Sequence, residues 1–142
     1  MNNQVNRQQD WLNSMNAGLR GFQTGRLGDA VAAFNQAVQI LPERVEGWVN
    51  LVSALLEARQ YDSAARALQK AVSVEPKFMA AHLTLGDALR QLGNVPKTIE
   101  SYRQAVALQK TVMGLNKLAC ALRITKEVAE AEALYREAIA ME

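Results

Sequence analysis

The feature that most constrains this sequence is a repeat with a period of 34 residues. Ala30 and Pro42 return as Ala64 and Pro76, each 34 positions further along the chain, and two related copies follow toward the C-terminus. A period of this size is typical of solenoid proteins, in which each unit buries its apolar face only by stacking on its neighbours. The repeat therefore takes precedence over any short local motif.

One unit reads as helix, short turn, helix. In residues 45–77, the apolar residues Trp48, Leu51 and Leu55 recur at three- and four-residue steps, which indicates an amphipathic helix. A second apolar series at helical spacing follows a short polar turn and ends at Pro76. Strands have no comparable signal in the sequence, so the prediction is an all-α fold.

Several residues mark where the helices begin and end. Asn94, followed by Pro96, and Asp62 are predicted to cap the second helices of their units by accepting hydrogen bonds from free amides. Gly25 and Gly93 stand where the first helices must end, in positions suited to left-handed backbone.

Small and large residues alternate along the second helices. Ala30, Ala64 and Ala131 let the paired helices approach closely, and Thr98 is the exception. Large side chains stand one turn further on and are expected to face the seam between units: Phe34, Leu68, Tyr102 and Tyr135.

The landmarks Trp48, Leu51, Leu55, Ala64 and Pro76 together resemble a tetratricopeptide repeat. The resemblance covers roughly residues 12–142. It implies an all-α, right-handed superhelix, an α-solenoid of antiparallel helix pairs, whose first helices line a concave groove.

The expected organisation is a polar N-terminal segment followed by one repeat domain. Residues 1–10 form the polar segment, which can extend the first helix. Residues 11–142 form a single domain with units at about 11–44, 45–78, 79–111 and 112–142.

The resemblance also implies which residues face the groove. These positions run from apolar and amide side chains in the first units to charged ones in the last. They are Leu12, Met15, Asn16, Leu19, Val49, Asn50, Ser53, Leu56, Leu83, Thr84, Asp87, Arg90, Asn116, Lys117, Cys120 and Arg123.

Two known modes of peptide binding can be compared with these positions. Asn16 and Asn50 resemble two rungs of the asparagine ladder of O-linked N-acetylglucosamine transferases, although asparagine is also common there for local packing. Cochaperone repeats bind a terminal carboxylate through polar residues, and here Met15, Leu19 and Ala80 occupy those places. Binding of chaperone tails is therefore disfavoured.

Composition excludes several classes of function. Sixteen basic and fourteen acidic residues are interspersed, which gives no support for nucleic acid or membrane binding. The single cysteine excludes an internal disulfide and the usual zinc and haem spacings. The N-terminus is polar and no apolar run reaches the length of a membrane span, so we expect a cytoplasmic protein without membrane insertion.

No catalytic, metal or cofactor site is expected. His82 lacks a partner at a useful spacing, and Cys120 lies among alanines as a small apolar filler. Glu130 and Glu132 are two residues apart on a helix and point in different directions. The glycines of residues 21–29 lack the Lys and Ser/Thr of a phosphate loop.

The sequence thus predicts a non-enzymatic protein-interaction scaffold that binds a peptide or helical segment of a partner in its groove. Two alternatives stay open. One is the N-terminal recognition part of a longer enzyme of glycosyltransferase or sulfotransferase type. The other is a self-assembling module that forms a homo-oligomer through the apolar face of the last helix, made of Leu134, Tyr135, Ala138 and Ile139.

Overall fold

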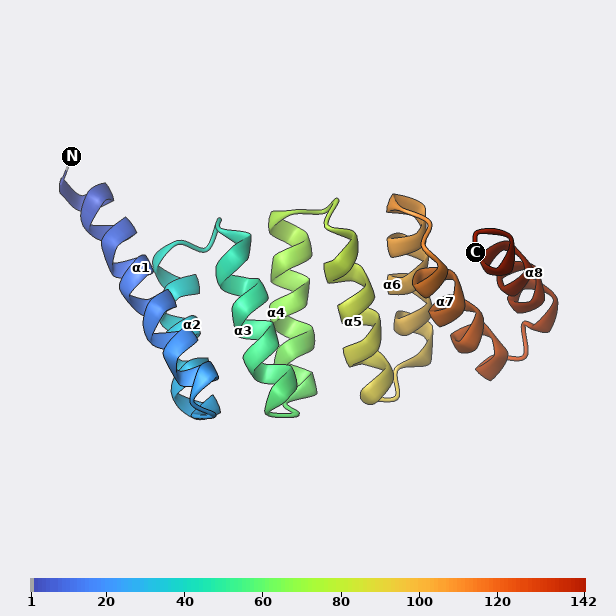
Figure 1. Ribbon diagram of the computed structural model, residues 1–142, viewed down its shortest axis with the longest axis horizontal. Coiled ribbons are helices and arrows are strands. Elements are labelled where there is room, and N and C mark those ends of the chain that lie inside the picture. The colour runs from blue at the N-terminus through green and yellow to red at the C-terminus, as the bar shows by residue number, and fades with distance from the viewer. Residues whose placement is uncertain (1) are drawn as a thin grey trace. The chain divides into compact units, whose positions relative to one another are not determined.

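The computed structural model describes residues 2–142, and this part of the chain is entirely helical apart from its turns (Figure 1). The all-α prediction is confirmed. The helices are α1 Asn2–Gln23, α2 Leu27–Ile40, α3 Val45–Glu57, α4 Tyr61–Val74, α5 Met79–Gln91, α6 Val95–Leu108, α7 Val112–Ile124 and α8 Val128–Ala140.

The chain forms two compact units. The first unit ends at Pro76 and contains α1 to α4, and the second runs from Lys77 to Glu142 and contains α5 to α8. Each unit therefore holds two of the four predicted repeats. Because α1 begins at Asn2, most of the polar N-terminal segment continues the first helix.

All four helix pairs use the same left-handed turn. Gly25, Arg59, Gly93 and Lys126 follow the first helix of each pair and have positive φ angles of 74°, 59°, 78° and 65°. In each repeat the next amide bonds back to a carbonyl five residues earlier, as from Arg26 N to Gly21 O at 2.8 Å. This is the Schellman pattern, and it confirms the prediction for the two glycines.

The two predicted N-caps have different outcomes. Asn94 caps α6, since its side chain accepts a hydrogen bond from the Lys97 amide at 3.3 Å. The prediction for Asp62 is wrong: Gln60 stands at the N-cap of α4 without a side-chain hydrogen bond, and Asp62 lies in the first turn, where it pairs with Arg66. The shared turn fixes where each second helix begins, so the N-cap lies two residues before the better capping side chain.

The predicted close contacts between paired helices are confirmed at Ala30, Ala64 and Ala131, which are almost completely buried. A Cβ atom at Gly21 would lie only 3.0 Å from the Ala30 amide nitrogen. At the exceptional position, the Thr98 hydroxyl donates to the Asn94 carbonyl at 2.8 Å. Its polar group is therefore satisfied inside the contact.

Two large aromatic rings lie over glycines of their own helix pair. A Cβ atom at Gly18 would be 2.3 Å from the Phe34 ring, and one at Gly86 would be 2.3 Å from the Tyr102 ring. These rings therefore fill space inside a helix pair, which corrects the expectation that they simply face the seam between units. The glycines weaken the helices locally, but they make room for an almost fully buried ring.

Trp11 anchors the long first helix. Its side chain is 6% exposed, and the guanidinium carbon of Arg44 lies 4.6 Å from the centre of the ring. Arg7, one turn earlier, donates to the Ile40 carbonyl at 2.7 Å. These contacts attach α1 to the end of α2 and the start of α3, although α1 carries few of the apolar landmarks of the other first helices.

Candidate functional site

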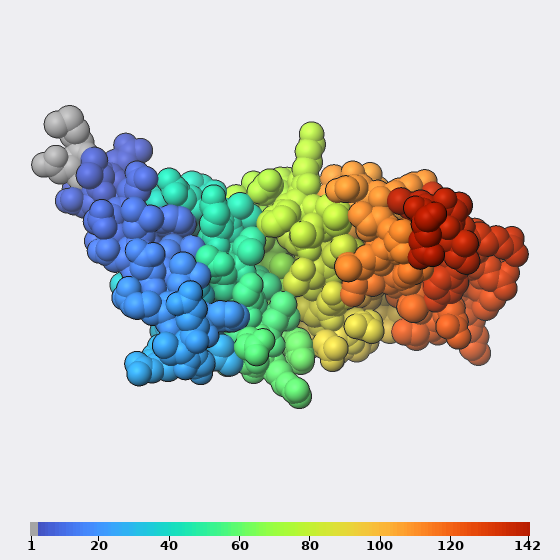
Figure 2. All heavy atoms as spheres, in the orientation of Figure 1, coloured from blue at the N-terminus to red at the C-terminus, as the bar shows by residue number. Residues whose placement is uncertain are grey.

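In the first unit, the predicted binding residues other than the buried Met15 lie on the solvent side of α1 and α3. Ser53 is exposed on α3, whereas Leu51 and Leu55 are buried on its opposite side. Figure 1 shows α1 and α3 in front of α2 and α4 in this unit, and the space-filling view shows their atoms at its surface (Figure 2). We call this surface the unit-1 face: Leu12, Asn16, Leu19, Phe22, Val49, Asn50, Ser53 and Leu56.

The unit-1 face carries no charged side chain. Leu12 and Leu19 are each 40% exposed, and Phe22 is 37% exposed. The Ser53 hydroxyl donates to the Val49 carbonyl of its own helix at 3.1 Å. The face therefore offers apolar surface interrupted by the two asparagine amides.

Two predicted binding residues are buried, and one exposed residue was missed. Met15 is 6% and Leu83 is 8% exposed, so both belong to the packed interior and offer little surface to a ligand. The exposed residue is Phe22, which adds apolar surface to the unit-1 face. Its position was readable from the repeat, since Phe22, Leu56 and Arg90 are spaced by 34 residues.

In the second unit, two of the predicted residues, Asp87 and Lys117, form a hydrogen-bonded cluster with Tyr102. The Tyr102 hydroxyl donates to Asp87 Oδ1 at 2.5 Å. Lys117 Nζ donates to Oδ1 at 2.8 Å and to Oδ2 at 3.0 Å. One carboxylate on α5 thus connects a phenol on α6 with an ammonium group on α7.

Burial of Tyr102 and its hydrogen bond to Asp87 raise the pKa of the phenol above its usual value, so the hydroxyl stays protonated as a donor. Next to it lies a pocket of about 170 Å³ lined by Arg90, Tyr102, Asn116, Lys117 and Cys120, which we call the polar pocket. Four of these five residues were predicted. Tyr102 was missed because its hydroxyl reaches this side from the second helix of the pair.

The fourth repeat places a similar pair at the equivalent positions. Cys120 Sγ lies 3.2 Å from the Tyr135 hydroxyl, and the two residues are 15 positions apart, as are Asp87 and Tyr102. The contact with Cys120, followed by burial, raises the pKa of Tyr135. Cys120 is exposed and polar in its contacts, which corrects the view of it as an apolar filler.

Models of a known protein family match the same repeats. Tetratricopeptide repeat models match residues 22–71, 49–112 and 111–141. The chain belongs to the tetratricopeptide repeat (TPR) family.

Curated TPR proteins match part of the chain. The small glutamine-rich tetratricopeptide repeat-containing protein 2 of Mycosarcoma maydis is 29% identical over 90 residues, 63% of this chain and 26% of that protein. The Hsp70-Hsp90 organizing protein of Triticum aestivum is 26% identical over 98 residues, 69% of this chain and 17% of that protein. The chain thus spans about a quarter or less of these relatives.

Solved structures of MamA share the TPR fold. One crystal structure of MamA has a TM-score of 0.84 at 20% identity and covers 92% of this chain and 77% of its own. MamA from Desulfovibrio magneticus RS-1 has a TM-score of 0.79 at 20% identity, over 89% and 72% of the two chains. This likeness supports the all-α helical repeat fold.

The predicted binding residues of the second unit carry a net positive charge, whereas the unit-1 face carries none. Arg90 and Arg123 are exposed, while Lys117 and Asp87 neutralise each other. Asn116 adds an amide that both donates and accepts. We call this the unit-2 face: Thr84, Asp87, Arg90, Asn116, Lys117, Cys120 and Arg123.

Within residues 2–142, no helix is both long and apolar enough to cross a membrane. In the same part of the chain, no group of three His, Cys, Asp or Glu side chains is placed to hold a metal ion.

Proposed function

We propose that this protein is a protein-interaction scaffold that binds peptide segments of a partner, through the unit-1 face in one unit and through the unit-2 face in the other. The observation that carries the proposal is the chemistry of each face. The unit-1 face suits a segment with apolar side chains, and the unit-2 face suits a segment with acidic side chains.

The unit-1 face supports the apolar half of this proposal. Leu12, Leu19 and Phe22 expose enough side chain to bury against a ligand, at roughly 25 cal/mol per Å² of apolar surface removed from water. Asn16 and Asn50 can pair with the donors and acceptors of a peptide backbone without selecting its side chains.

The unit-2 face supports the acidic half. Arg90 and Arg123 can form bidentate hydrogen bonds with carboxylates. Lys117 is less available, because its charge is already matched by Asp87 at 2.8 Å. A ligand carboxylate is therefore expected to bind the arginines and to leave the Asp87 cluster intact.

The relatives support binding of a protein, and they leave the partner open. The Hsp70-Hsp90 organizing protein is named for two chaperones, but the chain spans only 17% of it. The residues here favour another partner, since Met15 is buried and Leu19 and Ala80 are apolar where a cochaperone has polar groups.

The test is selection from a displayed library of random peptides of about 12 residues, an extended span of about 40 Å. We expect two classes of enriched peptide, one apolar and one acidic, each binding with micromolar affinity, about −8 kcal/mol. Binding of the acidic peptides should weaken about tenfold in Arg90→Glu, and binding of the apolar peptides should weaken about tenfold in Asn50→Ala. The charge-matched control is Lys97→Glu on α6.

Peptides that bind Arg90→Glu and Asn50→Ala as tightly as the wild type would contradict the proposal. Loss of binding in Lys97→Glu alone would place the site elsewhere in the second unit. Addition of salt should weaken the binding of acidic peptides more than the binding of peptides that contain only apolar residues, because salt screens exposed charges.

A further inference from the structure

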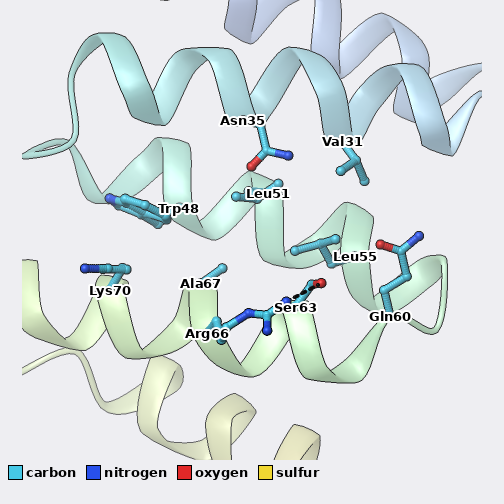
Figure 3. Close-up of a pocket in the computed structure, with 10 residues that line it drawn as sticks. All are labelled: Val31, Asn35, Trp48, Leu51, Leu55, Gln60, Ser63, Arg66, Ala67 and Lys70. Carbon is cyan, nitrogen blue, oxygen red and sulfur yellow. Dashed lines mark hydrogen bonds between the residues drawn. The ribbon is translucent and has the colours of Figure 1, made fainter.

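The first unit has a second open surface, on the side opposite the unit-1 face. A pocket of about 340 Å³ lies between α2 and α4, with α3 as its floor. Figure 3 shows Val31 and Asn35 along one wall and Arg66 and Lys70 along the other. We call it the back pocket.

The floor of the back pocket is apolar and elongated. Trp48, Leu51 and Leu55 line it from α3, and they span seven residues, or about 10 Å of helix. The Trp48 indole is held by a hydrogen bond from Nε1 to the Pro42 carbonyl at 2.8 Å. Because Leu51 and Leu55 are only 3% and 4% exposed, the half-buried Trp48 ring offers most of the apolar surface of the floor.

The equivalent space in the second unit is bridged by ion pairs. Arg103 on α6 makes a bidentate contact with Glu130 on α8, at 2.5 Å and 3.0 Å. Lys110, just beyond α6, pairs with Glu137 on α8. Both bridges connect the second helices of neighbouring repeats.

At the equivalent positions, the first unit lacks both bridges. By repeat spacing, Asn35 and Ser63 correspond to Arg103 and Glu130. Lys70 stands in the place of the acidic residue Glu137, opposite Pro42, and it makes none of the ion pairs found within residues 2–142. The wall formed by α4 is thus left with a basic residue that has no acidic partner.

We propose that the back pocket docks an amphipathic helix of a partner protein, with its apolar stripe on the α3 floor and acidic side chains against Lys70 and Arg66. None of the ten residues that line the pocket is acidic. Lys70 and Arg66 are four residues apart on α4, so acids one turn apart on the partner match them. Arg66 already contacts Asp62 at 2.8 Å, and Lys70 is therefore the stronger determinant.

This site is independent of the unit-1 and unit-2 faces, and its test uses a defined probe. The probe is a fluorescein-labelled, alanine-based helical peptide of about 14 residues, with Leu at i, i+3 and i+7 and Glu along one flank. Fluorescence anisotropy measures its binding to the full chain. A second peptide has Lys in place of each Glu.

We expect the acidic peptide to bind with a Kd on the order of 10 μM and the basic peptide to bind about tenfold more weakly. Lys70→Glu should reverse this preference. The double variant Asn35→Arg/Ser63→Glu copies the Arg103–Glu130 bridge into the first unit and should close the pocket. Binding of the acidic peptide should then weaken about tenfold, while the circular dichroism spectrum stays unchanged.

Arg90→Glu, which alters the unit-2 face, should leave binding of the acidic peptide within about twofold of wild type. Equal binding by the wild type, Lys70→Glu and the bridged variant would overturn the proposal. Loss of binding in Arg90→Glu alone would assign the peptide to the unit-2 face instead. A solution mass that rises with concentration, and falls in Lys70→Glu, would show that a second copy of this chain occupies the pocket. That result would overturn the proposal of a partner helix.

Discussion

The two units use the same repeat frame and differ in where they place charge. On the unit-1 face, Ser53 stands 15 residues before Leu68, and neither is charged. At the equivalent places in the second unit, Asp87 accepts a hydrogen bond from Tyr102. In the second unit, an acid on the face thus occurs together with a phenol beneath it.

The opposite sides of the units differ in the same way. In the second unit, Arg103 and Glu130 bridge α6 and α8. Arg103 holds the pKa of Glu130 below its usual value, so the acid stays ionised at neutral pH. In the first unit the corresponding residues are Asn35 and Ser63, and the back pocket is open. On this side, the second unit pairs charges across α6 and α8, whereas Lys70 of the first unit belongs to none of the ion pairs found within residues 2–142.

The largest predicted effect concerns Gly86 and the Tyr102 ring that lies over it. Gly86→Val should lower the free energy of unfolding by about 3 kcal/mol, because its side chain would collide with the Tyr102 ring. The second repeat has Val52 and Leu68 at these places, so adding Tyr102→Leu should restore stability to within about 1.5 kcal/mol of wild type. Urea unfolding measures both. If the double variant is no better than Gly86→Val, the residues are not paired.

The next effect concerns the Asp87 cluster. Asp87→Ala should cost about 1–3 kcal/mol, since it leaves the buried Tyr102 hydroxyl and the Lys117 ammonium without their acceptor. Ser53→Ala, the matched change in the first unit, should stay within about 0.5 kcal/mol of wild type. Equal urea midpoints for the two variants would show that the cluster does not stabilise the second unit.

Alkaline pH should reveal the same cluster. The raised pKa of Tyr102 makes a stabilising contribution that is fully present below the unfolded value of about 10 and is lost as the pH rises toward the folded value. The melting temperature should therefore fall as the pH rises above about 10, and it should fall less in Tyr102→Phe. Parallel curves for the two proteins would contradict this assignment.

The smallest effect concerns the shared left-handed turn. Arg59→Gly and Lys126→Gly should each stabilise the fold by about 0.5–1 kcal/mol, because glycine adopts positive φ without strain. Gly25→Ala should destabilise it by about 1 kcal/mol, although an added Cβ meets no atom within 4 Å. Thermal melts that rank these variants in any other order would show that φ is not what distinguishes the four turns.

Local spacing predicted the parts of the fold that depend on one helix or one turn. The positions of Gly25 and Gly93, the alanine contacts and the Asn94 cap all follow from residue type and helical periodicity. The Asp62 prediction failed because capping preference is weaker than the turn geometry that all four pairs share.

The features that depend on two helices together could not be read in this way. Glycine weakens a helix, and the reason for Gly18 appears only when Phe34 is placed across the pair. Met15 has the right repeat position for the groove, but helix packing buries it. The bond between Asp87 and Tyr102 likewise requires the register of α5 against α6. A 15-residue spacing gives no signal of its own in a single sequence.

The central claim is that the solvent side of the first helices binds the partner, and the natural cysteine gives the most direct test. Cys120 is exposed, lines the polar pocket and is the only cysteine of the chain. An environment-sensitive fluorophore on Cys120 should change its emission when a selected peptide is added, with the same midpoint as binding. The control is the double variant Cys120→Ser/Lys97→Cys, which carries the fluorophore on α6. Its emission should not change when the peptide is added. A response from the α6 label together with an unchanged signal from Cys120 would contradict the claim.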